Sequence, residues 1–136
     1  MPLVLDADIL TDLPKKREGV YLRLRAALAA GEQVYVSPVA YYEVLRGLFH
    51  IEATKQIDLL QRLCAGFKWH DLSRSVWENA AALWARCRRQ GKPLAHQSAL
   101  DADVLIASHA ASLGATIATR NVEHFRILGA NFEDWN

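Results

Sequence analysis

Residues 98–125, SALDADVLIASHAASLGATIATRNVEHF, contain an order of elements from which the fold can be inferred. Ser98 is a suitable N-cap for a helix, and Gly114 is a suitable stop for the same helix. The apolar run at 115–119 then reads as a strand, and Asn121 begins a short helix. This stretch predicts a helix that turns back onto a strand, which is the unit of an α/β fold.

Strands and helices are predicted to alternate along the rest of the chain as well. Strands are expected at residues 2–6, 33–37, 67–71 and 131–136. Helices are expected over residues 20–28, 38–49 and 52–65, with a long helix that opens at a capping box, Ser75–Glu78, and ends before Gly91 and Pro93. Such alternation predicts a three-layer α/β/α domain with a central parallel sheet of four to five strands.

The bulk composition is consistent with a single domain spanning residues 1–136. Hydrophobic residues make up 51% of the chain, which is enough for a core. Sixteen basic side chains oppose fifteen acidic ones, so the net charge predicts no nucleic-acid partner. Two basic clusters are expected to be solvated helix faces, with phosphate contact as the alternative: Lys15, Lys16, Arg17, Arg23 and Arg25, and Arg86, Arg88, Arg89 and Lys92.

The sequence predicts a soluble, cytoplasmic protein. No basic stretch followed by an apolar run opens the chain, and no apolar stretch approaches the roughly 18 residues of a membrane span. Cys64 and Cys87 fall at apolar helix positions and lack Cys-x-x-Cys spacing, so we expect buried thiols in a reducing compartment. The five histidines lack His-x-x-x-His spacing, so the sequence does not predict a histidine-ligated zinc site.

Three acidic residues and one amide are predicted to meet at one edge of the sheet. Asp6 ends the first strand, Asn121 follows the strand at 115–119, and Glu43 lies about two turns into the helix after the second strand. Asp103 lies near the start of a helix that runs back antiparallel to its strand. The helix and strand have nearly equal lengths, ~15 and ~17 Å, so Asp103 should return to the same edge. Ligands bind at this carboxyl edge in parallel sheets.

Each acidic residue also has an interpretation in which it neither binds a metal nor takes part in catalysis. Asp6 would serve as an N-cap or turn residue, and Glu43 would be a surface residue paired with Arg46. Asp101 and Asp103 both favour the first turn of a helix, but two residues of helix rotate about 200°, so only one faces the sheet. Asp103 shares its face with small apolar residues and is preferred as a ligand, and Asp101 is left as a capping partner or an outer helper.

Gathered carboxylates without basic partners repel each other and raise their own pKa values, and a divalent cation relieves this repulsion. Oxygen-only ligands suit Mg²⁺, with Mn²⁺ as a substitute. The sequence therefore predicts that Asp6, Glu43 and Asp103 hold a metal in an enzyme that cleaves phosphodiesters. The Asp-x-Asp pair of Asp6 and Asp8 leaves one alternative, because haloacid-dehalogenase-like phosphatases begin in this way.

Residues 2–13 (PLVLDADILTDL), 36–48 (VSPVAYYEVLRGL) and 98–125 resemble the PIN domain of VapC-type toxins, and the similarity extends over nearly the whole chain. Matched by position, Asp6, Glu43 and Asp103 correspond to the family's acidic metal triad and Asn121 to its fourth position. Asp8 is a departure, since the family usually has Asn or Ser there. It leaves open whether one metal ion binds or two.

The resemblance implies a Mg²⁺-dependent endoribonuclease that is the toxin of a type II toxin–antitoxin system. It implies cleavage of structured RNA such as tRNA or rRNA by a metal-activated water, leaving a 5′-phosphate and a 3′-hydroxyl. The implied partners are a VapB-like antitoxin and a second copy of the chain in a homodimer, or a larger toxin–antitoxin hetero-oligomer. A PIN-fold module that binds RNA or acts as a scaffold without catalysis is the alternative.

We also expect an antitoxin-docking groove between the helices at 38–49 and 52–65. The first of these helices carries more large apolar side chains than one face can bury. The side chains in question are Tyr41, Tyr42, Leu48 and Phe49.

Overall fold

The computed structural model describes residues 1–91 and 99–136. Its strands are β1 (Leu3–Leu5), β2 (Val34–Val36), β3 (Lys68–Trp69), β4 (Thr116–Thr119) and β5 (Phe132–Asp134). Its helices are α1 (Ala7–Asp12), α2 (Glu18–Ala29), α3 (Pro38–His50), α4 (Thr54–Ala65), α5 (Arg74–Arg89), α6 (Ala99–Ser112) and α7 (Val122–Ile127).

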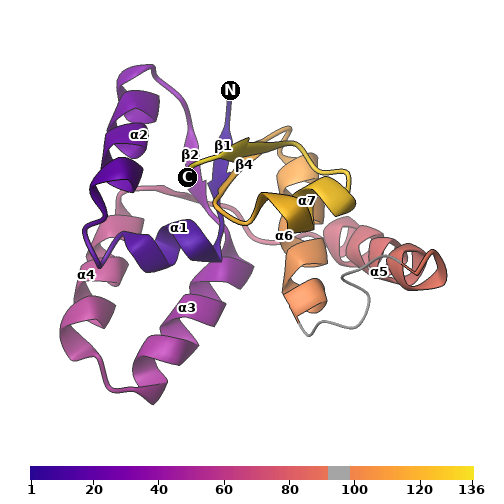
Figure 1. Ribbon diagram of the computed structural model, residues 1–136, viewed down its shortest axis with the longest axis horizontal. Coiled ribbons are helices and arrows are strands. Elements are labelled where there is room, and N and C mark those ends of the chain that lie inside the picture. Colours follow the sequence, from indigo (N-terminus) through magenta and orange to yellow (C-terminus); the bar gives the residue numbers. More distant parts are fainter. Residues whose placement is uncertain (92–98) are drawn as a thin grey trace.

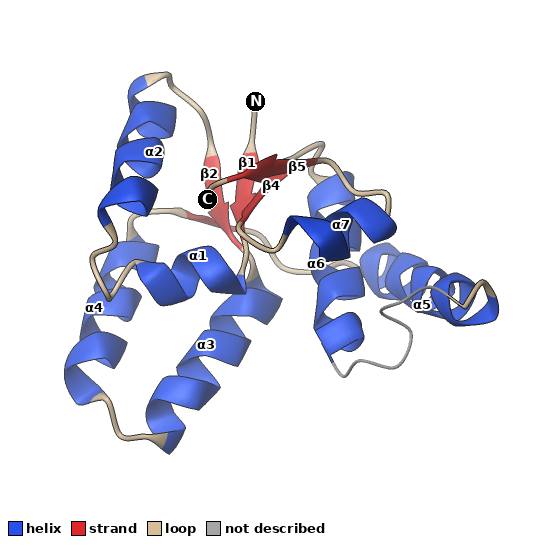
Figure 2. Ribbon diagram, viewed as in Figure 1, coloured by secondary structure: helices blue, strands red, loops and turns tan. Residues whose placement is uncertain are grey.

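The five strands form one parallel sheet in the order β3-β2-β1-β4-β5. Helices α1 to α4 lie on one side of this sheet, and α5 to α7 lie on the other (Figures 1 and 2). The chain therefore has the α/β fold with a helix-flanked parallel sheet that the sequence predicts. The order also places β1 at the centre, with β2 and β4 beside it, so the ends of these three strands are neighbours.

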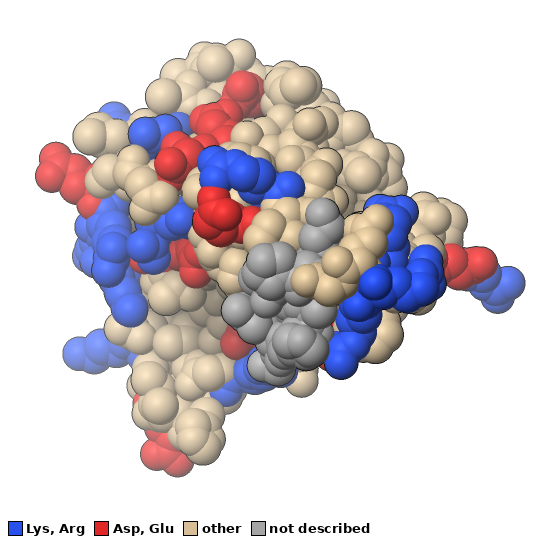
Figure 3. All heavy atoms as spheres, turned by 45° about the vertical axis from the view of Figure 1, so that its right-hand side comes forward, with Lys and Arg blue, Asp and Glu red and all other residues tan. Residues whose placement is uncertain are grey.

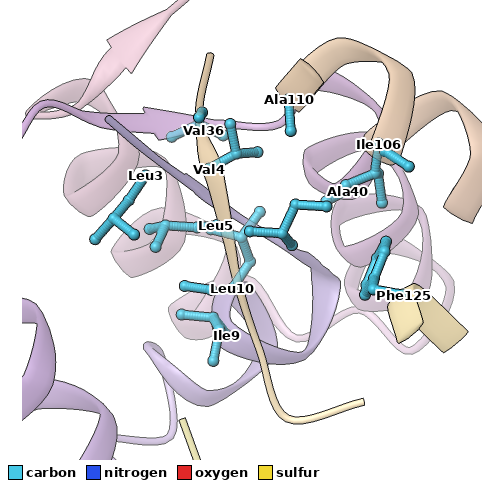
Figure 4. Close-up of a cluster of buried hydrophobic side chains, with 14 of the residues drawn as sticks. Leu3, Val4, Leu5, Ile9, Leu10, Val36, Ala40, Ile106, Ala110 and Phe125 are labelled. Carbon is cyan, nitrogen blue, oxygen red and sulfur yellow. The ribbon is translucent and has the colours of Figure 1, made fainter. Parts of the chain in front are cut away.

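The core is built around β1. Leu3, Val4 and Leu5 are at most 1% exposed, which is expected for a central parallel strand covered on both faces. Leu5 lies in register with Val36 of β2 and Ala118 of β4. Figure 4 shows side chains from α1, α3, α6 and α7 gathered around this strand. The residue after Leu5 is Asp6, so a carboxylate directly follows the most buried strand.

Local signals explain where the helices begin and end. The Ser37 Oγ accepts a hydrogen bond from the Ala40 N–H at 3.2 Å, and Pro38 occupies the first helical position of α3. Gly114 ends α6 with a φ of +62°, a conformation that costs a residue with a Cβ more than it costs glycine. These features confirm the predicted start of α3 and the predicted stop of α6.

The structure differs from the sequence prediction in two places. Helix α1 was not expected, although Ile9, Leu10 and Leu13 are spaced to bury one helical face. Helix α5 begins at Arg74, with Ser73 as its N-cap, and the capping box at Ser75 was therefore the wrong start. The predicted N-cap Ser98, as well as Lys92, Pro93 and His96, lie outside the described residues.

A buried ion pair links α1 to the loop after β4. Asp12 is 1% exposed, and its Oδ2 lies 2.6 Å from the Nε of Arg120. The Arg120 Nη2 donates to Oδ1 at 3.2 Å, and the Arg17 Nε lies 3.3 Å from the same oxygen. A carboxylate at this depth requires a charge partner. Asp12 thus fixes the position of the segment between β4 and α7, which includes Asn121.

We expect Arg120→Ala to lower the free energy of unfolding by about 2–3 kcal/mol, because a buried carboxylate would lose its main partner. Arg17 remains within 3.3 Å of Asp12, which limits the loss. Urea unfolding measures the change. Arg62→Ala, which removes only an exposed pair with Asp58, is the control and should leave the midpoint nearly unchanged. Equal midpoints for the two variants would contradict a structural role of the buried pair.

None of the described helices combines the length and the apolar character that crossing a bilayer requires. Cys64 and Cys87 are both buried and unpaired, as predicted from their helix positions.

Candidate functional site

Asp6 lies at the junction between β1 and α1, where its carboxylate is almost entirely buried at 4% exposure. Its Oδ1 accepts a hydrogen bond from the Ile9 N–H at 3.2 Å, so the side chain caps α1. Burial raises the pKa of Asp6 from 3.8 to about 7, and the charges of Asp8 and Asp103 act in the same direction. An aspartate that only caps a helix does not need to be buried where its ionised form is destabilised.

Asp103 lies in α6, close to the N-terminal end of the helix, and its side chain is 13% exposed. Its Oδ2 lies 2.6 Å from the Nδ1 of His124 in α7. Burial, followed by the charge of Asp8, raises the pKa of Asp103, while His124 lowers it. As predicted, Asp103 lies on a largely buried helix stripe, whose other members are Ile106, Ala107 and Ala110.

Glu43 lies in the second turn of α3 and is half-buried. Burial raises the pKa of Glu43, and the charges of Asp103 and Asp8 add to this effect, whereas Arg46 lowers it. The guanidinium of Arg46 lies over the ring of Tyr42, 5.2 Å from its centroid. Among the described residues no ion pair within 4.0 Å joins Glu43 to Arg46, so the surface-pair reading of Glu43 finds no support.

The three carboxylates and Asp8 form an electrostatic cluster. Asp103 raises the pKa of both Asp6 and Glu43, and Asp8 raises the pKa of all three. Asp8 is therefore a member of the cluster, which the sequence left undecided. In the part of the chain that the structure describes, no three His, Cys, Asp or Glu side chains already surround a common point as metal ligands would.

The chemistry of this donor set nevertheless fits a hard divalent cation. All of the clustered acids offer carboxylate oxygens, which Mg²⁺ and Mn²⁺ prefer. Their raised pKa values have a shared cause, because negative charge accumulates in a desolvated place. A cation between the carboxylates would offset both the repulsion and the burial.

Asn121 approaches the cluster through Thr119. The Thr119 side chain hydrogen-bonds to the Asp6 carboxylate, and its Oγ1 accepts a hydrogen bond from the Asn121 N–H at 2.8 Å. Asn121 is the N-cap residue of α7, but its side chain makes no capping hydrogen bond. Thr119 is thus part of the site, and its position at the carboxyl end of β4 is the signal that could have identified it.

Asp101 has a different environment from Asp103. It is exposed and lines an open cleft of about 870 Å³ between α3, α5 and α6. Glu43 and Arg46 from α3, Trp77 from α5 and Leu105 from α6 also line the cleft. Asp101 does not contribute to the raised pKa values of the clustered acids. The cleft joins the cluster at Glu43 and gives a large molecule access to it.

The side chains predicted to line a docking groove between α3 and α4 lie in different environments. Tyr42, which was placed in it, lines the cleft beside α5 and α6 instead. Tyr41 packs edge-on against Trp69 of β3, with ring centroids 5.6 Å apart. Leu48 is partly buried against the core, and Phe49 stays 57% exposed. Antitoxin docking between α3 and α4 therefore stays a prediction.

The two basic clusters differ in their environments. In the first, Arg17 is engaged with Asp12, and Arg23 donates to the carbonyl oxygens of Asp134 and Asn136. The second cluster crowds the last turn of α5 with Arg86, Arg88 and Arg89. Figure 3 shows Lys and Arg side chains gathered on the right-hand part of the face drawn, where α5 lies. Basic residues therefore lie on the same side of the molecule as one wall of the cleft.

The chain is similar in sequence and fold to known proteins. A family model described as PIN domain matches residues 3–129. "Ribonuclease VapC1" of Haemophilus influenzae (strain R2866) is 26% identical, over 99% of this chain and 98% of the relative. The sequence similarity therefore runs nearly from end to end.

Solved structures show the same fold. The VapBC2 structure from Rickettsia felis, bound to a DNA fragment from its promoter, superposes with a TM-score of 0.84 at 22% identity and covers 100% of both chains. The VapBC-1 structure from nontypeable Haemophilus influenzae gives a TM-score of 0.80 at 23% identity, over 99% of this chain and 98% of the other.

Proposed function

The chain belongs to the PIN domain family, and on that premise we propose that it is a metal-dependent endoribonuclease, the toxin of a type II toxin–antitoxin system. The observation that carries the proposal is the desolvated cluster of Asp6, Glu43 and Asp103 at the carboxyl edge of the sheet. The family match removes the basis for the haloacid-dehalogenase-like alternative. Asp8 then becomes an additional negative charge in the cluster instead of the acid of a phosphatase.

Asp6, Asp103 and Glu43 are proposed to hold a Mg²⁺ ion, for which Mn²⁺ would substitute. When bound, the ion would offset the charge of the scissile phosphate and lower the pKa of an attacking water. Because these ligands must be ionised to bind a cation, bound protons compete with the metal. The raised pKa of Asp6, about 7, places this competition close to neutral pH.

Glu43 is proposed as the general base. It is half-buried at the mouth of the cleft, and its raised pKa makes it a better proton acceptor than an ordinary carboxylate. Glu43 would take a proton from the water while the water oxygen bonds to phosphorus. The bond from phosphorus to the 3′-oxygen would then break and the departing oxygen would take a proton from solvent, which leaves a 5′-phosphate and a 3′-hydroxyl. Asn121 and Thr119 would orient Asp6 during this step.

The proposed substrate is structured RNA, tRNA or rRNA, reached through the cleft beside Glu43. The arginines at the end of α5 would contact the phosphates on the approach to the cleft. The proposed partners are a VapB-like antitoxin, as the solved relatives named VapBC suggest, and a second copy of the chain. Such a toxin would act in the cytoplasm, where these RNAs occur.

Product-end analysis tests the proposed chemistry. The purified chain should cleave RNA with Mg²⁺ and yield fragments that carry a 5′-phosphate and a 3′-hydroxyl. Fragments ending in a 2′,3′-cyclic phosphate would contradict the proposal, because that product requires attack by the RNA 2′-hydroxyl. Calorimetric titration with Mg²⁺ and Mn²⁺ tests the metal separately. Absence of divalent binding at millimolar concentration would favour the non-catalytic scaffold.

A further inference from the structure

His124 contacts the carboxylate cluster, although no sequence motif singled it out. Its Nδ1 lies 2.6 Å from the Asp103 Oδ2, and the two side chains are only 18% and 13% exposed. They come from different helices, α7 and α6, and are 21 residues apart in the sequence. An ionised carboxylate only accepts hydrogen bonds, so with Asp103 ionised the Nδ1 of His124 would be the donor in this contact. The contact therefore fixes one oxygen of Asp103 in a defined direction.

The other oxygen of Asp103 has no such partner. Among the described residues, Oδ1 of Asp103 accepts no hydrogen bond, whereas each carboxylate oxygen has two lone pairs to offer. Of the groups that act on the pKa of Asp103, only His124 favours the ionised form, the form that binds a cation. His124 thus favours the ionised form of Asp103, as the hydrogen bonds from the Ile9 amide and Thr119 favour the ionised form of Asp6.

The contact is not required to attach α7 to the core. Phe125, the next residue, is 1% exposed and anchors α7 in the hydrophobic cluster. Helix α6 is held by its own buried apolar stripe, which includes Ile106 and Ala110. Apolar packing therefore holds both helices in place beside this polar pair. The orientation of Asp103 is what the pair controls.

We propose that His124 is a positioning residue that holds Asp103 by one oxygen so that the other is directed to the divalent cation. The inference rests on the proposed function, since it assumes that Asp103 is a metal ligand. Partners of this kind orient metal-binding side chains, and their loss typically weakens metal affinity by about 10- to 100-fold.

Two substitutions at the same position test the proposal. In His124→Asn the side-chain amide can replace the Nδ1 donor, whereas in His124→Phe the ring keeps its bulk but has no donor. Mn²⁺ dissociation constants from calorimetry should rise about 10- to 100-fold in the Phe variant. In the Asn variant they should stay within about threefold of the unmodified chain. His50→Phe, at an exposed position at the end of α3, is the control and should not change the affinity.

The outcomes separate this inference from the proposed function. If the unmodified chain binds no Mn²⁺, the proposed function itself fails. If it binds Mn²⁺ and His124→Phe binds equally well, only the positioning role is overturned. The same holds if His124→Asn loses as much affinity as His124→Phe, because the ring would then matter and not the Nδ1 donor. Urea unfolding of the metal-free variants identifies any loss that comes from a damaged fold.

Discussion

Asp103→Asn is expected to reduce RNA cleavage by about three orders of magnitude or more, while the chain still folds. The substitution preserves the shape of the side chain but removes the negative charge that a divalent cation needs. The charge of Asp8 acts on Asp103, and that of Asp103 acts on Glu43, so the substitution removes one charge from the carboxylate cluster. Initial rates of cleavage of a defined RNA, with Mg²⁺ in excess, measure the loss.

Asp101→Asn is the matched control for this experiment. Asp101 lies on the same helix two residues earlier, carries the same charge and is exposed to solvent in the cleft. Its substitution should change the cleavage rate by no more than a few-fold, because it does not belong to the carboxylate cluster. Full activity of Asp103→Asn, or an equal loss in both variants, would contradict the assignment of Asp103 as the ligand.

The main features of the fold were predictable because they depend on local signals. The apolar run ending at Asp6, the Ser37 cap with Pro38, and Gly114 after a helix each determine a boundary through nearby atoms. A parallel sheet then follows from the alternation of elements, and its carboxyl edge determines where ligands bind. The prediction that Asp6, Glu43 and Asp103 lie at this edge follows from these signals.

The features that were missed depend on contacts between distant residues. His124 lies 21 residues from Asp103, and Arg120 lies 108 residues from Asp12. No periodicity connects such pairs, so the sequence predicted neither contact. Helix α1 was missed for another reason. It has only six residues, so it depends on its cap and on tertiary packing more than on helix propensity.

The start of α5 shows a limit of capping motifs. Ser73 and Ser75 are both acceptable N-caps, and Glu78 three residues after Ser75 favoured the later one. In the structure the Ser73 Oγ accepts from the Val76 N–H, while the Ser75 Oγ lies 3.0 Å from the Ser73 Oγ inside the first turn. When two capping residues are close together, packing of the following helix decides between them.

Asp6→Asn should raise the stability of the metal-free protein above pH 7 by up to about 4 kcal/mol. The pKa of Asp6 is raised from 3.8 to about 7, and each unit corresponds to about 1.4 kcal/mol. The folded state holds this proton more tightly than the unfolded state, so the contribution of Asp6 to stability is fully present below about pH 4. It is lost as the pH rises towards 7. Asparagine has no charge to bury and still caps α1.

The difference in the free energy of unfolding between Asp6→Asn and the unmodified chain should therefore be near zero at about pH 4. It should grow to a plateau above about pH 7. Urea unfolding in a chelating buffer measures it, with Asp58→Asn, an exposed position, as the control that should change little at any pH. Adding Mg²⁺ should narrow this difference, since a ligand at 100 times its dissociation constant stabilises the unmodified chain by about 2.7 kcal/mol and the Asn variant has lost a ligand. An Asp6→Asn protein that is less stable than the unmodified chain at high pH without metal would refute the cost of burying the Asp6 charge, on which the metal site is inferred. Stabilisation of both proteins by Mg²⁺ to the same extent would instead show that the ion binds without Asp6.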